Sequence, residues 1–341
     1  MRRIGLIDFD SKQVNLALMK LAAYHKAQGD FVILNPTSAA QVDKVYCSVL
    51  FSWNRDAALR LGEIFPNIVF GGTGFDLTTT LPAEVEAMRP DYDLYSAEVI
   101  EKRIKGIMTK ETRRKKAEEV VNAGIGFTAR GCIRTCPWCV LPVKEGKLRS
   151  VGSLSDLVNP RSNIVTLLDA NLTADPDCLE KLKQAKEMGL VLDITQGVDV
   201  RLITDDIAKA LSEVKHLRSI TYAWDLIHSE KPVTEGITTL SKFIKPWKHL
   251  VYMLSGYRST FEEDFYRFRK LAEIGVSPYV MIYRGEGGLE DEYEKLRLQH
   301  FARYVNGRIY KTGAKFSEYS NWLKAEAKFL ANSEQPMLLA M

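Results

Sequence analysis

The sequence predicts an α/β protein in which two modules, each built on parallel strands, follow one another along the chain. Short apolar runs alternate with helical segments from residue 3 onward. The alternation stops between residues 77 and 123 and resumes at Gly124. Strands that alternate with helices across short links form parallel sheets, because each helix carries the chain back to the start of the next strand.

The first module is expected over residues 1–76. Its predicted strands are Arg3–Asp8, Phe31–Leu34, Lys44–Phe51 and Asn67–Phe70, and its predicted helices are Asn15–Gln28 and Asp56–Ile64. Gly29 follows the first helix, where a left-handed residue commonly ends one. With helices on both faces of the sheet, this is a doubly wound, Rossmann-like module.

The second module is expected over residues 124–290, behind a partly helical connector at residues 77–123. Its predicted strands are Gly126–Ala129, Ile164–Asp169, Val191–Val198, Ser219–Trp224, Leu250–Leu254 and Pro278–Tyr283. Its predicted helices are Ser153–Val158, Asp177–Met188, Asp205–Val214, Val233–Phe243 and Phe261–Ile274. Six β/α units are fewer than the eight of a closed barrel, so we expect a partial (β/α)6 TIM-type barrel. A C-terminal helical segment, residues 291–341, begins with a helix at Asp291–Val305.

Composition excludes several classes of protein. Apolar residues make up 46% of the 341 residues and charged residues 26%, the mixture of an ordinary globular protein rather than a disordered or fibrous one. No stretch approaches the roughly 18 apolar residues that a membrane helix needs. The start of the chain has no cleavable apolar run. We therefore expect a soluble, cytoplasmic protein that does not contact membranes.

Positive charge is concentrated in one segment. The net charge is only +4, but residues 101–118 contain eight Lys/Arg and three Glu. One interpretation is a solvated helix face in the connector. The other is a patch that meets phosphate, which keeps a nucleic acid or a phosphorylated substrate open as a partner.

Three of the five cysteines lie within eight residues. Cys132, Cys136 and Cys139 have the spacing C-x3-C-x2-C, directly after the first predicted strand of the second module. Three thiolates on one loop can hold three corners of a [4Fe-4S] cluster and leave one iron open. The alternative, a structural zinc site, needs four Cys or His ligands, and no fourth lies nearby in the sequence.

This motif resembles that of the radical SAM enzymes, with Trp138 in the aromatic position before the last cysteine. The resemblance extends over about residues 124–285. It implies that Cys132, Cys136 and Cys139 bind the cluster and that S-adenosylmethionine chelates the fourth iron. One electron then cleaves S-adenosylmethionine into methionine and a 5′-deoxyadenosyl radical, which takes hydrogen from a substrate. Trp138 is expected to pack near the adenine, or otherwise to be an ordinary core aromatic.

Further cofactor contacts are expected at strand ends. Asp169 and Asn171 stand where the family often has Gly-Gly-Glu, and the alternative for them is helix capping. Arg201 is a candidate for the carboxylate of S-adenosylmethionine, or for a structural ion pair with Asp199. Gly256 lies on the rim after the fifth strand, where ribose and adenine contacts would fall.

The N-terminal module resembles the cobalamin-binding domains that precede many radical SAM barrels. Ser48-Val-Leu50 matches S-x-L in that domain, and Gly71-Gly72 matches its later Gly-Gly. It departs from the family in the loop Asp8–Gln13, which lacks the cobalt-ligating His. Cobalamin is therefore a doubtful cofactor, and a scaffold or lid is the favoured role.

Three functions follow. The first is a radical SAM enzyme that acts on an unidentified substrate and takes electrons from a donor such as flavodoxin or ferredoxin. The second is a cobalamin-dependent radical SAM methyltransferase. The third is a non-catalytic iron–sulfur binding protein.

Overall fold

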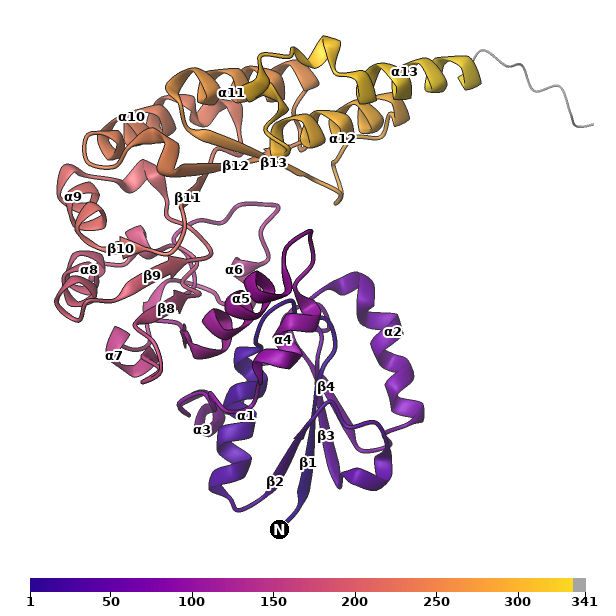
Figure 1. Cartoon of the computed structure of the whole chain (residues 1–341), viewed down its shortest axis with the longest axis vertical. Coiled ribbons are helices and arrows are strands. Elements are labelled where there is room, and N and C mark those ends of the chain that lie inside the picture. Colours follow the sequence, from indigo (N-terminus) through magenta and orange to yellow (C-terminus); the bar gives the residue numbers. More distant parts are fainter. Residues whose placement is uncertain (334–341) are drawn as a thin grey trace, which may run out of the picture. The chain divides into compact units, whose positions relative to one another are not determined.

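The computed structural model describes residues 1–333 and separates them into two compact units (Figure 1). The first unit contains Met1–Ala170 and Lys183–Thr195, and the second contains Asn171–Leu182 and the chain from Gln196 onward. Among the described residues, every helix is too short or too polar to cross a bilayer. The predicted domain boundaries after residues 76, 123 and 290 stay predictions, and the last eight residues of the predicted C-terminal segment lie outside the description.

The N-terminal sheet consists of four strands that all run parallel. These are β1 (Arg3–Asp8), β2 (Phe31–Leu34), β3 (Lys44–Ser48) and β4 (Ile68–Gly71), in the order β2-β1-β3-β4. The predicted parallel arrangement is confirmed. Its assignment to the Rossmann-like class stays a prediction.

Both faces of this sheet are covered. Successive side chains of a strand point to opposite faces, so Ile4 and Leu6 lie on one side of β1 and Ile7 on the other. Ile4 and Leu6 share a core with Leu18 of α1 (Leu16–Ala27), whereas Ile7 packs with Ala58 of α2 (Arg55–Leu59). Figure 1 shows α1 and α2 on opposite sides of β1–β4.

The predicted connector is helical and leads into a second parallel sheet. It contains α3 (Ala83–Glu86), α4 (Ala97–Arg103) and α5 (Lys110–Asn122). The buried faces of α4 and α5 meet β5 (Gly124–Gly126) in one core, whereas Val85 of α3 packs with Ile4 and Leu6 of β1. β5 pairs with β8 (Ile164–Leu167), and β8 pairs with β9 (Val191–Ile194), both in parallel. The remaining elements here are β6 (Ala129–Arg130), α6 (Leu141–Lys144), β7 (Arg149–Ser150), α7 (Leu154–Leu157) and α8 (Cys178–Glu187).

The second unit contains a three-stranded parallel sheet of its own, in the order β11-β12-β13. The strands of this sheet are β11 (Ile220–Ala223), β12 (His249–Ser255) and β13 (Ser277–Ile282). The unit also contains the short strand β10 (Lys215–His216) and the helices α9 (Asp205–Glu213), α10 (Glu230–Ser241), α11 (Phe261–Ile274), α12 (Glu292–Asn306) and α13 (Ser320–Ser333). The strands β11, β12 and β13 are the three predicted last for the barrel, and the partial barrel as a whole stays a prediction.

Short 3-10 helices occur in both units, at residues 39–41, 52–54, 60–63, 172–174, 200–202, 227–229, 246–248, 309–312 and 316–318.

Local sequence signals place α11. Thr260 accepts a hydrogen bond from the Glu263 amide, and the Glu263 carboxylate accepts one from the Thr260 amide in return. Gly275 ends the helix at φ +86°, a conformation that costs glycine little. The apolar face of α11 packs Phe261 and Phe268 against Phe301 of α12. Aromatic contacts of this kind form much of the core of the second unit.

Candidate metal and cofactor site

The cysteine loop connects the two strands of a small hairpin that follows the carboxyl end of β5. β6 and β7 pair antiparallel and enclose residues 131–148. Gly131, directly before the first cysteine, has φ +82°, and a Cβ atom there would lie 2.3 Å from the Lys147 carbonyl oxygen. Only glycine permits this close approach of the two ends of the loop.

The loop holds its three thiols half-buried. The Cys132 amide donates to the Gly146 carbonyl at 3.3 Å, which ties the first cysteine to the far side of the loop. The Arg134 amide donates to the Cys132 sulfur at 3.4 Å. The Cys139 amide donates to the Cys136 carbonyl at 3.0 Å, so the last two cysteines share one tight turn. These backbone contacts fix the shape of the loop around its cysteines.

Buried polar contacts fix both ends of this loop. The Thr128 amide donates to Asp169 Oδ1 at 2.7 Å, and the Thr128 hydroxyl donates to the other oxygen of the same carboxylate. Arg130 binds both oxygens of Glu145 at 2.9 and 3.0 Å and stacks over the Phe127 ring at 3.9 Å. Arg130 also contacts Glu86 of α3 at 2.7 Å. The loop is thus held by charge-assisted bonds at its entry and its exit.

The donor set of this loop fits a thiolate-bound iron–sulfur cluster in its chemistry. Three cysteines on one segment match the ligands that such clusters use. Within residues 1–333, no group of three or more His, Cys, Asp or Glu side chains is placed to hold a metal ion. Trp138, half-buried between the second and third cysteines, belongs to the same segment.

The two residues predicted after β8 have separate roles. Asp169, fully buried, is the acceptor that secures Thr128. Asn171 caps the short helix at residues 172–174, accepting from the Ala174 amide at 3.2 Å and from the Thr173 hydroxyl at 3.1 Å. The structure therefore gives Asn171 the capping role that was the alternative for this pair. Contacts of either residue with a cofactor stay predictions.

Arg201 and Gly256 both lie in the second unit. Arg201 forms a two-pronged ion pair with Asp199, at 2.6 and 2.9 Å. This is the structural alternative to a carboxylate-binding role, which stays a prediction. Gly256 follows β12 at φ +76°, and its amide donates to the Asp264 carboxylate at 2.9 Å.

The sequence analysis missed a buried ion pair beside Gly256. Asp264 and Arg267 of α11 are each about 1% exposed and bind one another at 2.5 Å. Arg267 also donates to the carbonyl oxygens of Trp224 and Leu254, at the ends of β11 and β12. Burial raises the pKa of neighbouring Asp225, against the opposing effect of Arg267 and Arg201. The signal available in the sequence was the spacing of three that places an acid and a base on the apolar face of one helix.

The N-terminal module does not fit a His-ligated cobalamin. The loop after β1 has no His, and Ser48 accepts a hydrogen bond from Asn15 at 2.9 Å. A Cβ atom at Gly72 would lie 2.3 Å from the Val49 carbonyl oxygen, so this glycine serves the packing of its own chain. Both features that carry the resemblance therefore have uses within the module.

The basic segment lies on α4 and α5, and its exposed charges are partly compensated. Arg114 contacts Glu98 at 2.5 Å and Glu118 at 2.8 Å. Arg103 turns inward to the buried Asp8 carboxylate at 2.7 Å. The solvated-face interpretation agrees with these contacts, and binding of a polyanion stays a prediction.

Among known proteins, this chain resembles a few solved structures at low sequence identity. No family model matches the chain, and no curated protein matches it. Solved structures that resemble it include SuiB of Streptococcus suis bound to the precursor peptide SuiA (TM-score 0.42, 13% identity, 62% of this chain and 54% of that one). SuiB bound to S-adenosylmethionine has a TM-score of 0.39 and 12% identity, and the match covers 60% of this chain and 55% of that one. SuiB alone has a TM-score of 0.38 and 14% identity, and the match covers 69% of this chain and 65% of that one. The chain thus spans between about half and two thirds of the SuiB chains that it matches.

Proposed function

We propose that this protein is a radical SAM enzyme whose cluster is bound by Cys132, Cys136 and Cys139. The observation that carries the proposal is the C-x3-C-x2-C motif with Trp138, on a loop at the carboxyl end of a parallel strand. Parallel α/β folds place their chemistry at that end of the sheet. When bound, the cluster would supply the electron that cleaves S-adenosylmethionine into methionine and a 5′-deoxyadenosyl radical.

The chain's own residues have a positioning role in this proposal. Asp169 and Thr128 fix the entry to the loop, and Arg130 and Glu145 join its two ends. The Arg134 amide, which already meets the Cys132 sulfur, would stabilise the negative charge of a ligated thiolate. A flavodoxin or ferredoxin is the class of electron donor that we propose, because the reaction needs one electron at low potential.

Anaerobic reconstitution tests the ligand assignment. The protein is incubated with iron and sulfide under reducing conditions, desalted, and analysed for both elements and for its visible absorbance. We expect about four iron and four sulfide per chain, the content of one cluster. The variant with all three motif cysteines changed to Ala should bind neither, whereas Cys178→Ala should bind both normally. Full iron and sulfide in the triple variant would overturn the assignment.

Trp138 is tested separately, because it is proposed to contact S-adenosylmethionine rather than the metal. Trp138→Ala should keep the iron and sulfide content and bind S-adenosylmethionine about tenfold more weakly, as expected when one aromatic stacking contact is removed. Titration of S-adenosylmethionine into the reconstituted variant, followed by equilibrium dialysis, measures this. Loss of the cluster from this variant would contradict the adenine-contact role.

A further inference from the structure

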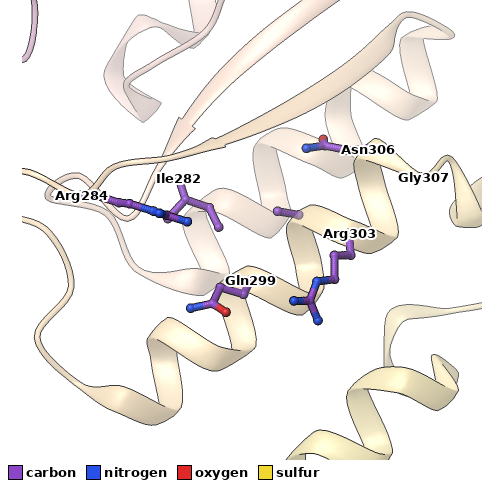
Figure 2. Close-up of a pocket in the computed structure, with 7 residues that line it drawn as sticks. Ile282, Arg284, Gln299, Arg303, Asn306 and Gly307 are labelled. Atoms are coloured by element: carbon purple, nitrogen blue, oxygen red, sulfur yellow. The ribbon is translucent and has the colours of Figure 1, made fainter. Parts of the chain in front are cut away.

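A groove in the second unit lies between the end of β13 and α12. Its volume is about 360 Å³. It is lined by Ile282, Arg284, Gln299, Ala302, Arg303, Asn306 and Gly307. In Figure 2, Ile282 and Arg284 reach it from the end of the strand, and Gln299 and Arg303 reach it from successive turns of the helix.

The groove carries uncompensated positive charge. Within the described part of the chain, neither the guanidinium groups of Arg284 and Arg303 nor the Gln299 carboxamide has a hydrogen bond or an ion pair. Arg297, two residues before Gln299 on the same helix, differs in that it contacts both Glu262 and Glu294. Two cations left unpaired beside one concavity favour an anionic ligand.

The strand edge beside the groove is closed to an added strand. Pro278 has no amide hydrogen to offer. The Asn306 carboxamide occupies the edge at Val280, accepting from its amide at 2.8 Å and donating to its carbonyl at 3.0 Å. The Tyr283 amide points to β12, where it donates to Ser255 at 2.9 Å, so the backbone of Ile282 faces the other way, toward the groove. Ile282 therefore leaves one outward amide and one outward carbonyl, too few to bind an extended peptide.

We propose that this groove binds a small organic anion by its carboxylate or phosphate group. Arg284 and Arg303 hold the oxyanion, because the planar guanidinium donates two parallel hydrogen bonds to either group. The Gln299 carboxamide and the backbone of Ile282 then meet the remaining polar atoms of the ligand. The site lies within one unit and needs neither the cysteine motif nor a cluster, so it goes beyond the proposed enzyme activity.

Ligand-observed NMR with the full-length protein tests this site, with succinate and inorganic phosphate as probes at constant ionic strength. We expect at least one probe to bind, and the double variant Arg284→Gln, Arg303→Gln to bind it at least tenfold more weakly. Arg269→Gln, an exposed arginine on α11, is the matched control and should bind normally. Binding of succinate alone or phosphate alone identifies the anion. Absence of binding by both probes, or an equal loss in the control, overturns the proposal.

Arginine modification by phenylglyoxal provides a test on the unaltered protein, which stands even where a variant fails to fold. Whichever of succinate and phosphate binds should slow modification of Arg284 and Arg303 severalfold, as measured by peptide mass spectrometry. Modification of Arg269 should continue at its original rate. Equal rates at Arg284 and Arg303 with and without a saturating probe would contradict the site.

Discussion

At the scale of single residues, the cysteines divide into two chemical environments. Cys47 of β3 is 2% exposed, and burial, together with the charges of Asp10 and Asp8, raises its pKa to about 12. Cys178 is also buried, at 3% exposure. The three motif cysteines are half-buried on a loop. Reactivity requires access, so the motif cysteines are the thiols that a reagent reaches first, and they remain the proposed metal ligands.

Alkylation of the metal-free protein measures this division. At pH 8 iodoacetamide should modify Cys132, Cys136 and Cys139 at least tenfold faster than Cys47, because the Cys47 thiol is almost never ionised at that pH. Peptide mass spectrometry over a time course gives each rate, and the same assay in urea serves as the unfolded control. Early labelling of Cys47 in the native protein would show that its environment is not the one described.

A buried histidine makes stability depend on pH. His249 is fully buried between the Tyr222 hydroxyl at 3.0 Å and the Ile244 carbonyl at 3.1 Å, and burial lowers its pKa to about 4. At pH 7.5, well above the ordinary pKa of about 6.5, the ring is neutral in both the folded and the unfolded state. As the pH falls, the unfolded state binds the proton first, so stability is lost. Between pH 7.5 and pH 5, this residue lowers the free energy of unfolding by about 2 kcal/mol.

Urea unfolding at the two pH values tests the His249 prediction. His249→Gln should be less stable at pH 7.5 but should lose about 2 kcal/mol less than the wild type on going to pH 5. Exposed His228 provides the control, and His228→Gln should retain the wild-type dependence. An unchanged dependence in His249→Gln would contradict this account.

At the scale of elements, the cysteine loop depends on the close approach at Gly131. Gly131 and Gly146 both have positive φ, so alanine strains the backbone at either position by about 1 kcal/mol. They differ in the room available for a side chain. A Cβ atom at Gly131 would lie 2.3 Å from a carbonyl oxygen, whereas a Cβ atom at Gly146 would have no other atom within 4 Å. The two positions therefore form a matched pair.

Iron content after reconstitution should separate these two glycines. Gly131→Ala should bind less than half the iron of the wild type, because the hairpin must open to relieve the contact. Gly146→Ala should bind nearly the full amount. Equal iron in both variants would show that the hairpin geometry has no part in metal binding.

Element order was predictable from the sequence where the signals are local. The apolar runs and the Gly29 stop of the N-terminal module predicted its parallel strands, and the helix predicted at Asp291–Val305 matches α12 to within one residue at each end. The strand expected at Val191–Val198 ends at Ile194, and the chain turns before Gly197, which takes φ +88°. The strand expected at Gly126–Ala129 is divided between β5 and β6. Its break depends on the bond from Thr128 to Asp169, 41 residues away, which no local pattern reports.

The candidate site was predictable only in part for the same reason. The cysteine spacing is local and was found directly. The ion pair of Asp264 with Arg267, which joins the ends of β11 and β12 through Trp224 and Leu254, becomes visible only when distant segments come together.

At the scale of the whole molecule, stability in the second unit rests on this buried ion pair. Arg267→Met leaves the buried Asp264 without its cation and should lower the free energy of unfolding by about 3 kcal/mol. The double variant Asp264→Leu, Arg267→Met should recover part of the loss. Arg269→Met, an exposed site on the same helix, should change little. Denaturant unfolding measures all three, and a loss below about 1 kcal/mol in Arg267→Met would contradict the assigned role.

The claim that concerns the whole protein is that it cleaves S-adenosylmethionine by one-electron reduction. The most direct measurement is the release of 5′-deoxyadenosine from S-adenosylmethionine and dithionite under anaerobic conditions, by the reconstituted protein. We predict that the nucleoside appears with the wild type and is absent when Cys132, Cys136 and Cys139 are all alanine. Equal amounts of nucleoside from the wild type and from that triple variant would contradict the account.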